Sequence, residues 1–307
     1  MAEKMKDLIL VTGSEGLVGS RFIEISESRT DFHAPTQIEM DITKPSEIRA
    51  ILASYNFRTI VHFAAFTDVN EAEKQRGDKN GDCWTINFIG TKNLVDAVKT
   101  SKNSIHFIQI STDMVFSGSA SDRGPYPENH PAEKNLAKLT WYGFTKAEAE
   151  RLVTNNLGDK MTILRLIYPV RVHYEAKLDF IRKYISLYDE GKPPPLFDDQ
   201  KISITFIDEA CKVLDKIISS KFYGVYHAGS LDLTTPYELM AYVLGKVRGG
   251  KNVQSIHLDD FLRKTKGQNF RYPKFGGLTV ENSQKKLGMK FTTWREIADN
   301  LISQGLK

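Results

Sequence analysis

The fold of this chain is decided by a glycine-rich segment near its start, Val11-Thr12-Gly13-Ser14-Glu15-Gly16-Leu17-Val18-Gly19. A short apolar run precedes the segment and predicts a strand, and the run that follows it predicts a helix. In that setting Gly13 permits the tight turn, Gly16 lets backbone N–H groups approach a pyrophosphate, and Gly19 lets the helix pack closely on the strand. The helix then presents its positive end to the phosphates. The segment therefore predicts a binding loop for a nicotinamide dinucleotide.

Outward from this loop, short apolar runs alternate with longer helical runs. The predicted strands lie at 7–12, 38–41, 59–63 and 104–110, and the predicted helices at 17–27, 46–54, 84–98 and from Thr140 onward. The strand runs are apolar almost throughout, as a parallel sheet covered by helices on both faces requires. The chain is therefore expected to be an α/β protein, with a Rossmann-type doubly wound parallel sheet and a smaller C-terminal substrate-binding lobe.

The second half of the chain departs from this strict alternation. Residues 117–138 are rich in Gly, Pro, Ser and charged residues, which predicts a long surface loop. We expect residues 1–167 to form the NAD(P)-binding Rossmann domain, with parts of 202–230 returning to its sheet. Residues 168–307 are expected to form mainly the substrate-binding lobe.

Composition excludes several classes of protein. The 307 residues are 41% hydrophobic and 26% charged. The formal net charge is only +4, and the lysines and arginines are scattered among acidic residues. The sequence has no basic stripe typical of nucleic-acid binding, no apolar run as long as a membrane span, and no apolar core of a secretory signal near its N-terminus. We expect a cytoplasmic protein whose partner is a small molecule, with a homodimer left open.

The sequence predicts no metal site. Cys83 and Cys211 are its only cysteines, and their separation does not fit a zinc motif or a disulfide framework. His62 and His106 fall inside predicted strands, where packing in the core is the commoner role of a histidine. No cluster of histidines and carboxylates is visible in the sequence.

A candidate catalytic pair follows the long loop. Tyr142 and Lys146 lie one helical turn apart, so their side chains share a face of the predicted helix. A nearby ammonium is expected to stabilise the phenolate and lower the pKa of Tyr142, which would suit the phenol to proton transfer. The segment Ser111-Thr112-Asp113 directly follows an apolar strand, where open α/β sheets place their ligand sites. Together the two motifs predict a catalytic site.

These residues resemble the extended short-chain dehydrogenase/reductase superfamily and, within it, the dTDP-4-dehydrorhamnose reductase family. The resemblance covers nearly the whole chain. Besides the glycine loop, it is carried by Asp41-Ile42-Thr43, Ala64-Ala65-Phe66-Thr67-Asp68-Val69-Asn70, Asn87, Ser111-Thr112-Asp113-Met114-Val115-Phe116, Pro125-Tyr126-Pro127-Glu128, and Tyr142-Gly143 with Lys146. The Ser-Thr-Asp-x-Val-Phe turn discriminates best, because related epimerases and dehydratases commonly carry other residues there.

The resemblance implies a role for each site residue. Tyr142 is the general acid that protonates the reduced carbonyl oxygen, Lys146 tunes it and holds the nicotinamide ribose, and Thr112 hydrogen-bonds the substrate carbonyl. Besides Tyr142 and Lys146, the implied cofactor-binding residues are Gly13, Glu15, Gly16, Leu17, Val18, Asp41, Ile42, Ala64, Ala65 and Asn87. The implied substrate-binding residues are Thr67, Val69, Asp113, Val115 and Phe116.

Four of these assignments have an ordinary structural alternative. Asp41 either faces the adenine ring or caps the next helix. The Ala64-Ala65 pair either lets the cofactor pass close to the backbone or packs tightly in the core. Asn87 lies near the cofactor or makes only local hydrogen bonds, and Asp113 contacts substrate or serves as a turn residue.

The implied activity is NAD(P)H-dependent reduction of the 4-keto group of a nucleotide-linked 6-deoxy sugar, as in dTDP-rhamnose biosynthesis. One alternative is a nucleotide-sugar epimerase or dehydratase of the same superfamily. Another is a non-catalytic NADP-binding regulatory subunit that resembles the one of methionine adenosyltransferase.

The expected cofactor is NADP(H), with NAD(H) as the alternative. NAD-selective proteins usually carry an acid at the end of the second strand, where it binds the ribose 2′-hydroxyl. Residues 32–37 occupy that place and contain no acid. Thr36 and Gln37 are able to hydrogen-bond a hydroxyl or a phosphate, and Arg21 and Arg29 are candidates to supply positive charge.

Overall fold

The computed structural model describes residues 8–28, 31–250, 253–265 and 272–307. Asp7, the first residue of the predicted first strand, and Arg29 lie outside these ranges. The helices and strands follow in the order β1 (Leu8–Thr12), α1 (Leu17–Ile25), β2 (Phe32–His33), α2 (Pro45–Ser54), β3 (Phe57–His62), α3 (Val69–Lys74), α4 (Asp82–Trp84), η2 (Thr85–Gly90), α5 (Thr91–Thr100), β4 (His106–Thr112), η3 (Asp113–Val115), η4 (Leu136–Lys138), α6 (Trp141–Leu157), η5 (Gly158–Lys160), β5 (Met161–Leu166), β6 (Pro169–Val170), α7 (Phe180–Asp189), β7 (Leu196–Phe197), β8 (Thr205–Phe206), α8 (Ile207–Ser220), β9 (Gly224–Ala228), α9 (Pro236–Val247), β10 (Ser255–Ile256), α10 (Leu258–Lys264), α11 (Glu281–Leu287) and α12 (Trp294–Ser303).

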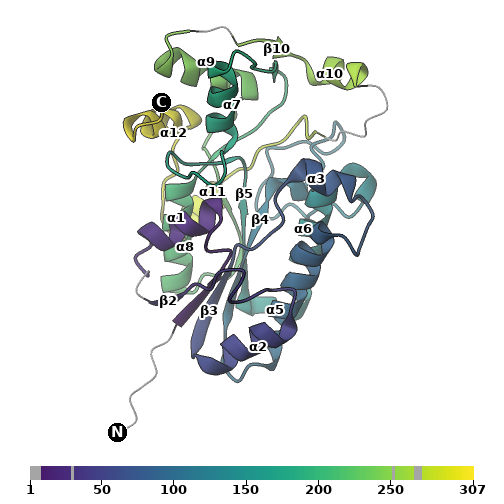
Figure 1. Cartoon of the computed structure of the whole chain (residues 1–307), viewed down its shortest axis with the longest axis vertical. Coiled ribbons are helices and arrows are strands. Elements are labelled where there is room, and N and C mark those ends of the chain that lie inside the picture. The colour runs from purple at the N-terminus through teal and green to yellow at the C-terminus, as the bar shows by residue number, and fades with distance from the viewer. Residues whose placement is uncertain (1–7, 29–30, 251–252, 266–271) are drawn as a thin grey trace. The chain divides into compact units, whose positions relative to one another are not determined.

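A six-stranded parallel sheet in the order β2-β1-β3-β4-β5-β9 organises the fold (Figure 1). The central pair is in register from Ile9 opposite Thr59 to Thr12 opposite His62. The chain leaves β1 for β2 and returns to β3 on the other side of β1, so the strand order reverses between β1 and β3. Open α/β sheets bind ligands beyond the carboxyl ends of their strands at such a reversal. The predicted Rossmann-type sheet is confirmed.

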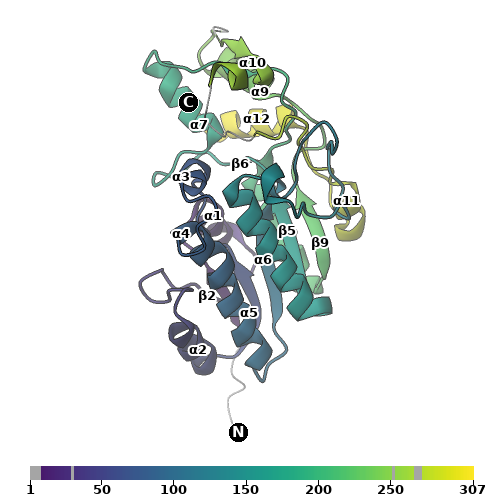
Figure 2. The ribbon, with the colours of Figure 1, turned by 90° about the vertical axis from the view of Figure 1, so that its right-hand side faces the viewer.

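Helices cover both faces of this sheet, which explains the apolar strands. Helices α5 and α6 lie side by side on one face, and α1 lies on the other (Figures 1 and 2). In β1, Ile9, Leu10 and Val11 are all completely buried. Because neither face meets water, successive residues of the strand are apolar instead of alternating with polar ones.

The strand expected at 38–41 is wrong, because the second strand is β2, which ends at His33. Pairing with β1 extends only from Phe32 to His33. The chain then enters a turn, where the Glu39 carboxylate accepts hydrogen bonds from the backbone N–H of Thr36 (2.8 Å) and from its hydroxyl (3.0 Å). Ile38 is 95% exposed. The apolar residues of this segment therefore do not form a buried strand.

The helix predicted at 84–98 is longer and is interrupted by a different helical form. Helical backbone runs from α4 through η2 into α5, and the six residues of η2 are wound as a π-helix. A π-helical turn takes up one residue more than an α-helical turn and is common at functional sites. Asn87, one of the implied cofactor-binding residues, lies in this segment.

The chain divides into two compact units. The first comprises Met1–Val115, Ala132–Arg165 and Cys211–Tyr226, and the second comprises Phe116–Pro131, Leu166–Ala210 and His227–Lys307. The predicted boundary at 167 places Phe116–Pro131 in the N-terminal domain, whereas this segment groups with the second unit. Among the helices of the described ranges, none has the length and apolar character needed to cross a membrane.

Candidate active site

The three glycines of the first loop have distinct surroundings. Gly13 adopts a φ of +67°, and a Cβ placed there would lie 2.5 Å from the backbone nitrogen of Ala64. A Cβ on Gly19 would overlap the carbonyl oxygen of Gly13. At Gly16, which caps α1 without a side-chain hydrogen bond, a Cβ would meet only the Gly13 carbonyl oxygen, at 3.2 Å. Gly13 and Gly19 are thus required by packing, whereas the space beside Gly16 suits a ligand.

The structure brings the three predicted catalytic residues together. Thr112 ends β4, while Tyr142 and Lys146 lie in the first turns of α6. The side chain of Thr112 lies close enough to the phenol of Tyr142 to act on its pKa. The Nζ of Lys146 donates a hydrogen bond to the carbonyl oxygen of Ile110, at 2.7 Å. The two motifs therefore meet where β4 ends, as the sequence predicts.

The expectation that Lys146 lowers the pKa of Tyr142 is wrong for this arrangement. Burial raises the pKa of the phenol, and the negative charge of Asp113 raises it further, against a smaller lowering effect from Thr112. Tyr142 packs against an aromatic cluster that includes Trp84 and Trp141. Because such surroundings solvate a phenolate poorly, the protonated form is favoured. Tyr142 therefore keeps its proton at neutral pH and is suited to donate it.

Two further groups in the site have shifted pKa values. Burial lowers the pKa of Lys146 to about 8, although the negative charge of Glu150 acts in the opposite direction. Burial raises the pKa of Asp113 to about 7, while hydrogen bonds from Thr112 and the backbone hold it lower than burial alone would. The Thr112 hydroxyl donates to the Asp113 carboxylate at 3.1 Å. Perturbed pKa values of this kind cluster at functional sites.

A buried ion pair lies one helical turn beyond Lys146. Arg165 of β5 donates from Nε and Nη2 to the two carboxylate oxygens of Glu150, at 2.9 and 2.7 Å. Both side chains are only 4% exposed. The bidentate geometry satisfies a carboxylate that would otherwise be costly to bury. It also fixes a negative charge beside the Lys146 ammonium.

Asn87 connects the segments around the site without reaching solvent. It is 1% exposed. Its side-chain oxygen accepts from the backbone N–H of Phe66 (2.8 Å), and its amide nitrogen donates to the Phe66 carbonyl (3.2 Å) and to the Thr145 hydroxyl (3.0 Å). Asn87 thereby ties the loop after β3 to the helix that carries Lys146. These hydrogen bonds join segments distant in the sequence, and a cofactor contact of Asn87 stays a prediction.

The other implied cofactor-binding residues follow β1 and β3 or precede α2. Glu15 is exposed, Leu17 and Val18 are half-buried, and Ala64 and Ala65 are half-buried.

Asp41 organises the turn before α2, because its carboxylate accepts from the backbone N–H of Thr43 (2.9 Å) and from its hydroxyl (2.7 Å). It does not cap α2 itself, whose cap residue is Lys44. Ile42 is buried, and a Cβ on Gly90 would lie 2.6 Å from its Cδ1.

The implied substrate-binding residues differ in exposure. Thr67 is exposed and Val69 is half-buried, whereas Val115 is fully buried in the first unit. Phe116, 3% exposed, belongs to the second unit and stacks on Tyr126 with ring centroids 4.1 Å apart. The Thr67 side chain is thus accessible to a ligand and that of Val115 is not, and substrate contact at either residue stays a prediction.

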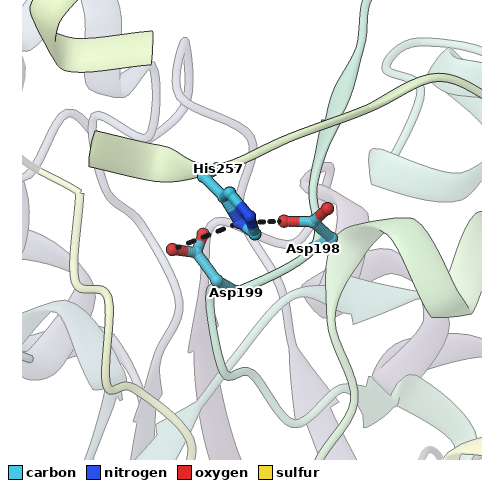
Figure 3. Close-up of side chains that lie close together, drawn as sticks. All are labelled: Asp198, Asp199 and His257. Atoms are coloured by element: carbon cyan, nitrogen blue, oxygen red, sulfur yellow. Dashed lines mark ion pairs between the residues drawn. The ribbon is translucent and has the colours of Figure 1, made fainter. Parts of the chain in front are cut away.

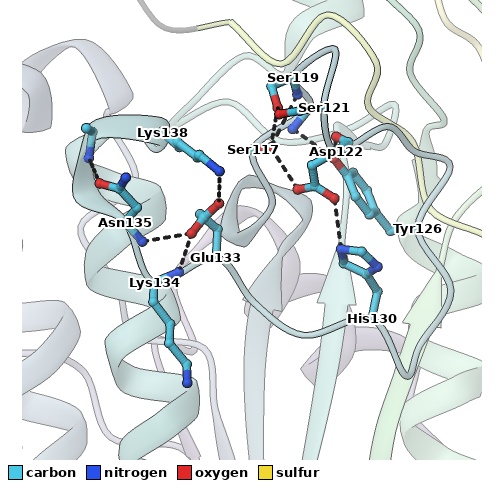
Figure 4. A network of polar contacts seen from close by, with 12 residues as sticks. Ser117, Ser119, Ser121, Asp122, Tyr126, His130, Glu133, Lys134, Asn135 and Lys138 are labelled. Atoms are coloured by element: carbon cyan, nitrogen blue, oxygen red, sulfur yellow. Dashed lines mark hydrogen bonds and ion pairs between the residues drawn. The ribbon is translucent and has the colours of Figure 1, made fainter.

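A polar network holds the loop that contains Tyr126 (Figure 4). Within the second unit, the carboxylate of Asp122 accepts from the Ser117 hydroxyl (2.7 Å) and pairs with Nε2 of His130 (3.0 Å). The Tyr126 hydroxyl donates to the backbone carbonyl of Asp122 at 2.6 Å. A separate set in the first unit centres on Glu133, which accepts from two backbone N–H groups and pairs with a lysine. The long loop predicted from sequence is therefore an ordered structure.

One group of side chains has the composition of a metal site. His257 pairs with Asp198 at 2.8 Å and with Asp199 at 3.8 Å (Figure 3). The ammonium of Lys274, however, lies 2.8 Å from Asp199 and 2.5 Å from Asp259. Because a lysine of the chain already supplies the positive charge, this cluster is an ion-pair network in the structure.

Sequence reasoning missed two residues that shape the site. Glu39 lies just beyond residues 32–37, and its carboxylate accepts a hydrogen bond from the hydroxyl of Thr36, a predicted partner for the cofactor. Gly143 is the other such residue, because a Cβ there would overlap the carbonyl oxygen of Met114. A sequence signal existed for Glu39, since an acid three residues after a threonine often closes a turn.

The fold and the arrangement of Thr112, Tyr142 and Lys146 define an NAD(P)-dependent oxidoreductase of the extended short-chain dehydrogenase/reductase superfamily. The family model of the RmlD substrate binding domain matches residues 5–306. The chain belongs to that family.

Relatives of known name agree with this assignment. A dTDP-4-keto-6-deoxy-D-glucose reductase from Streptomyces niveus is 29% identical over 236 residues, which cover 76% of this chain and 77% of the relative. A dTDP-4-dehydrorhamnose reductase from Aggregatibacter actinomycetemcomitans is 25% identical, with 95% of this chain and 97% of the relative covered. The crystal structure of a dTDP-4-dehydrorhamnose reductase from Bacillus anthracis in complex with NADP superposes with a TM-score of 0.83 at 25% identity, covering 98% of this chain and 100% of that one.

Proposed function

We propose that this protein reduces the 4-keto group of a nucleotide-linked 6-deoxy sugar with NADPH, in the manner of a dTDP-4-dehydrorhamnose reductase. The observation that carries the proposal is the meeting of Thr112, Tyr142 and Lys146 at the end of β4 in a chain of the RmlD family. The proposal takes the first unit as the NAD(P)-binding domain and the second as mainly the substrate-binding lobe.

The glycine loop fits the pyrophosphate of such a cofactor. Gly16 leaves the first turn of α1 uncovered by a side chain, and that turn carries no acidic residue. The positive end of a helix therefore faces the space beside Gly16. In this assignment Gly13, Glu15, Gly16, Leu17 and Val18 surround the phosphates. The remaining implied cofactor-binding residues flank the adenosine and the nicotinamide.

The chemistry follows from the protonation states of the chain's own residues. NADPH supplies the hydride that reduces the carbonyl carbon. Tyr142, whose raised pKa keeps it protonated, donates its proton to the carbonyl oxygen as negative charge develops there. Thr112 hydrogen-bonds the same oxygen and orients it. Lys146 holds the nicotinamide ribose with an ammonium that its bond to Ile110 fixes in place.

A direct assay tests the proposal. The protein is incubated with a panel of dTDP- and UDP-linked 4-keto-6-deoxy sugars, and NADPH consumption and product are measured, with Tyr142→Phe as the matched control. We expect one NADPH to be consumed for each sugar reduced. Turnover without net consumption of cofactor would instead indicate an epimerase or a dehydratase. Turnover with none of the sugars, combined with tight binding to another enzyme, would indicate the regulatory subunit.

We infer a preference for NADPH over NADH. Support comes from the absence of an acid between residues 32 and 37 and from the NADP bound to the related reductase from Bacillus anthracis. Arg21 pairs with Glu24 at 3.0 Å, and Arg29 lies outside the described residues, so neither arginine carries the inference. The measurement is kcat/KM for both cofactors with one substrate. A preference for NADH above about tenfold, roughly 1.4 kcal/mol, would indicate that Glu39 reads the ribose.

Two further points extend the proposal. We place the reaction in the cytoplasm, in agreement with two buried free cysteines. A homodimer stays a prediction, which light scattering on the purified protein would decide.

A further inference from the structure

His62 has no task in the proposed mechanism, although it ends β3 where the strand order reverses. It is 1% exposed. Both of its ring nitrogens have partners: Nδ1 lies 2.7 Å from the Thr12 hydroxyl, and Nε2 lies 3.1 Å from the Thr91 hydroxyl. In contrast, Nδ1 of His106, a second buried histidine of the sheet, has no hydrogen-bond partner among the described residues.

The hydrogen bonds around His62 determine which of its ring nitrogens carries the proton. The Thr91 hydroxyl donates its single proton to the carbonyl oxygen of Asn87, at 2.7 Å. It must therefore accept from Nε2 of His62, which places the ring proton on that nitrogen. The other nitrogen is then an acceptor for the hydroxyl of Thr12. The Thr12 oxygen in turn accepts the backbone N–H of Ala64, at 3.4 Å.

This chain of bonds joins three segments that carry implied cofactor-binding residues. Thr12 immediately precedes Gly13, Ala64 follows β3, and Asn87 lies in the π-helix η2. Gly13 and Ala64 are themselves in close backbone contact. A change at His62 therefore acts on the glycine loop and on the end of β3 together.

We propose that neutral His62, in a single tautomer, is a positioning residue that holds the glycine loop and the end of β3 in the relative placement that the dinucleotide requires. This inference rests on the proposed function, because it takes the loop of Gly13 as the cofactor site. The environment suits a neutral ring. Burial and, to a smaller extent, the positive charge of Lys146 lower the pKa of His62 to about 3. Across the physiological range the hydrogen-bond pattern is thus fixed.

The test compares His62→Phe with a matched control, His106→Phe. Both histidines are buried in neighbouring parallel strands, and both bind a threonine hydroxyl, which for His106 is that of Thr162 at 2.7 Å. His106 lies at the opposite end of its strand, where it pairs in register with Thr59. The two substitutions therefore replace a buried ring of the same size, with two hydrogen bonds lost at His62 and one at His106, but only His62 lies beside the glycine loop.

The readouts are the Kd of NADPH, measured by titration of the full chain without substrate, and kcat at saturating NADPH. We expect His62→Phe to raise the Kd at least tenfold and to change kcat less than threefold. We expect His106→Phe to change the Kd less than twofold, with thermal unfolding measured for both variants. Equal shifts in both variants, or an unchanged Kd in His62→Phe, would overturn the proposal. Failure of the unsubstituted protein to bind NADPH would overturn the proposed function itself.

A second set of variants covers the case in which His62→Phe does not fold. His62→Asn keeps an acceptor near the position of Nδ1, so the bond from Thr12 is retained and much of the NADPH affinity should return. Thr12→Val removes the same bond from the other side with little change in volume. We expect Thr12→Val to raise the Kd severalfold, and His62→Asn to raise it less than Thr12→Val. The reverse order would contradict a role that acts through Thr12.

Discussion

Gly143 lies directly against Met114, so that a Cβ on Gly143 would overlap the Met114 carbonyl oxygen. Gly143 follows Tyr142 in α6, and Met114 lies in η3, two residues after Thr112. The backbone of α6 therefore approaches η3 more closely than any residue with a side chain allows. This approach brings the phenol of Tyr142 to the hydroxyl of Thr112.

Gly143→Ala should separate these two groups. A displacement on the order of 1 Å is expected to lower kcat about 10²-fold, and overpacking should lower the free energy of unfolding by about 1–3 kcal/mol. The matched control is Gly245→Ala in α9, where a Cβ meets nothing within 4 Å. There alanine should stabilise the helix by roughly 0.5–1 kcal/mol and leave kcat unchanged. An unchanged kcat in Gly143→Ala would show that the close approach is not needed for turnover.

Tyr142→Phe removes the proposed acid and little else. We expect kcat to fall by about 10²–10⁴, while the Kd of NADPH stays close to that of the unsubstituted protein. Steady-state kinetics and cofactor titration measure the two effects. A variant with normal kcat would rule Tyr142 out as the general acid.

The charge of Lys146 predicts a pH dependence of cofactor binding. Its pKa of about 8 means that the ammonium loses its proton as the pH rises through about 8. The affinity for NADPH should therefore fall above about pH 8, whereas Lys146→Met should bind weakly and with little change between about pH 6 and about pH 10. Titrations of both proteins across this range check the prediction. If the affinity of both proteins changed with pH in the same way, Lys146 would not be the residue that binds the ribose.

The raised pKa of Asp113 predicts a pH dependence of stability. Its folded pKa, about 7, lies above the ordinary value of 3.8, so the folded state holds a proton that the unfolded chain has released. The contribution of Asp113 to stability is therefore full at low pH and is lost as the pH rises from about 4 to about 7. Relative to Asp113→Asn, the unsubstituted protein should lose about 2 kcal/mol between about pH 5 and about pH 8. Urea unfolding at both pH values measures it, and a constant difference between the two proteins would refute the assignment.

Gly16→Val tests the placement of the cofactor. Its side chain would enter the space beside the start of α1, where only the Gly13 carbonyl oxygen is near, so the fold should persist while dinucleotide binding is lost. Gly19→Ala is the contrasting variant, because its Cβ would overlap that same carbonyl oxygen and should destabilise the fold. Thermal unfolding and retention on a cofactor affinity column distinguish the two. Normal retention of Gly16→Val would place the dinucleotide elsewhere.

The sequence predicted those features that repeat a local rule. The glycine loop, the apolar strands and the Tyr142–Lys146 spacing each follow from backbone or helix geometry, and the structure contains all three. The position predicted for the second strand was wrong because Ile38 is apolar but exposed. Whether an apolar residue is buried depends on which other segments of the folded chain cover it.

The site was less predictable wherever a property depends on distant neighbours. The pKa of Tyr142 is decided by burial among Trp84 and Trp141, which no spacing in the sequence reveals. In the same way, Glu150 is satisfied by Arg165 of the next strand, and Asn87 by Phe66 and Thr145. Such partners come together only when the chain folds.

The π-helical turn at Thr85–Gly90 gives the helix from Asp82 to Thr100 two angular phases. Residues before and after the turn are offset by roughly 100°, the rotation of one α-helical residue. Removing one residue from this stretch would restore an unbroken α-helix, keep α5 against the sheet and swing Asn87 away from Phe66 and Thr145. This part of the chain is therefore more tolerant of substitution at its exposed positions than of any change in length.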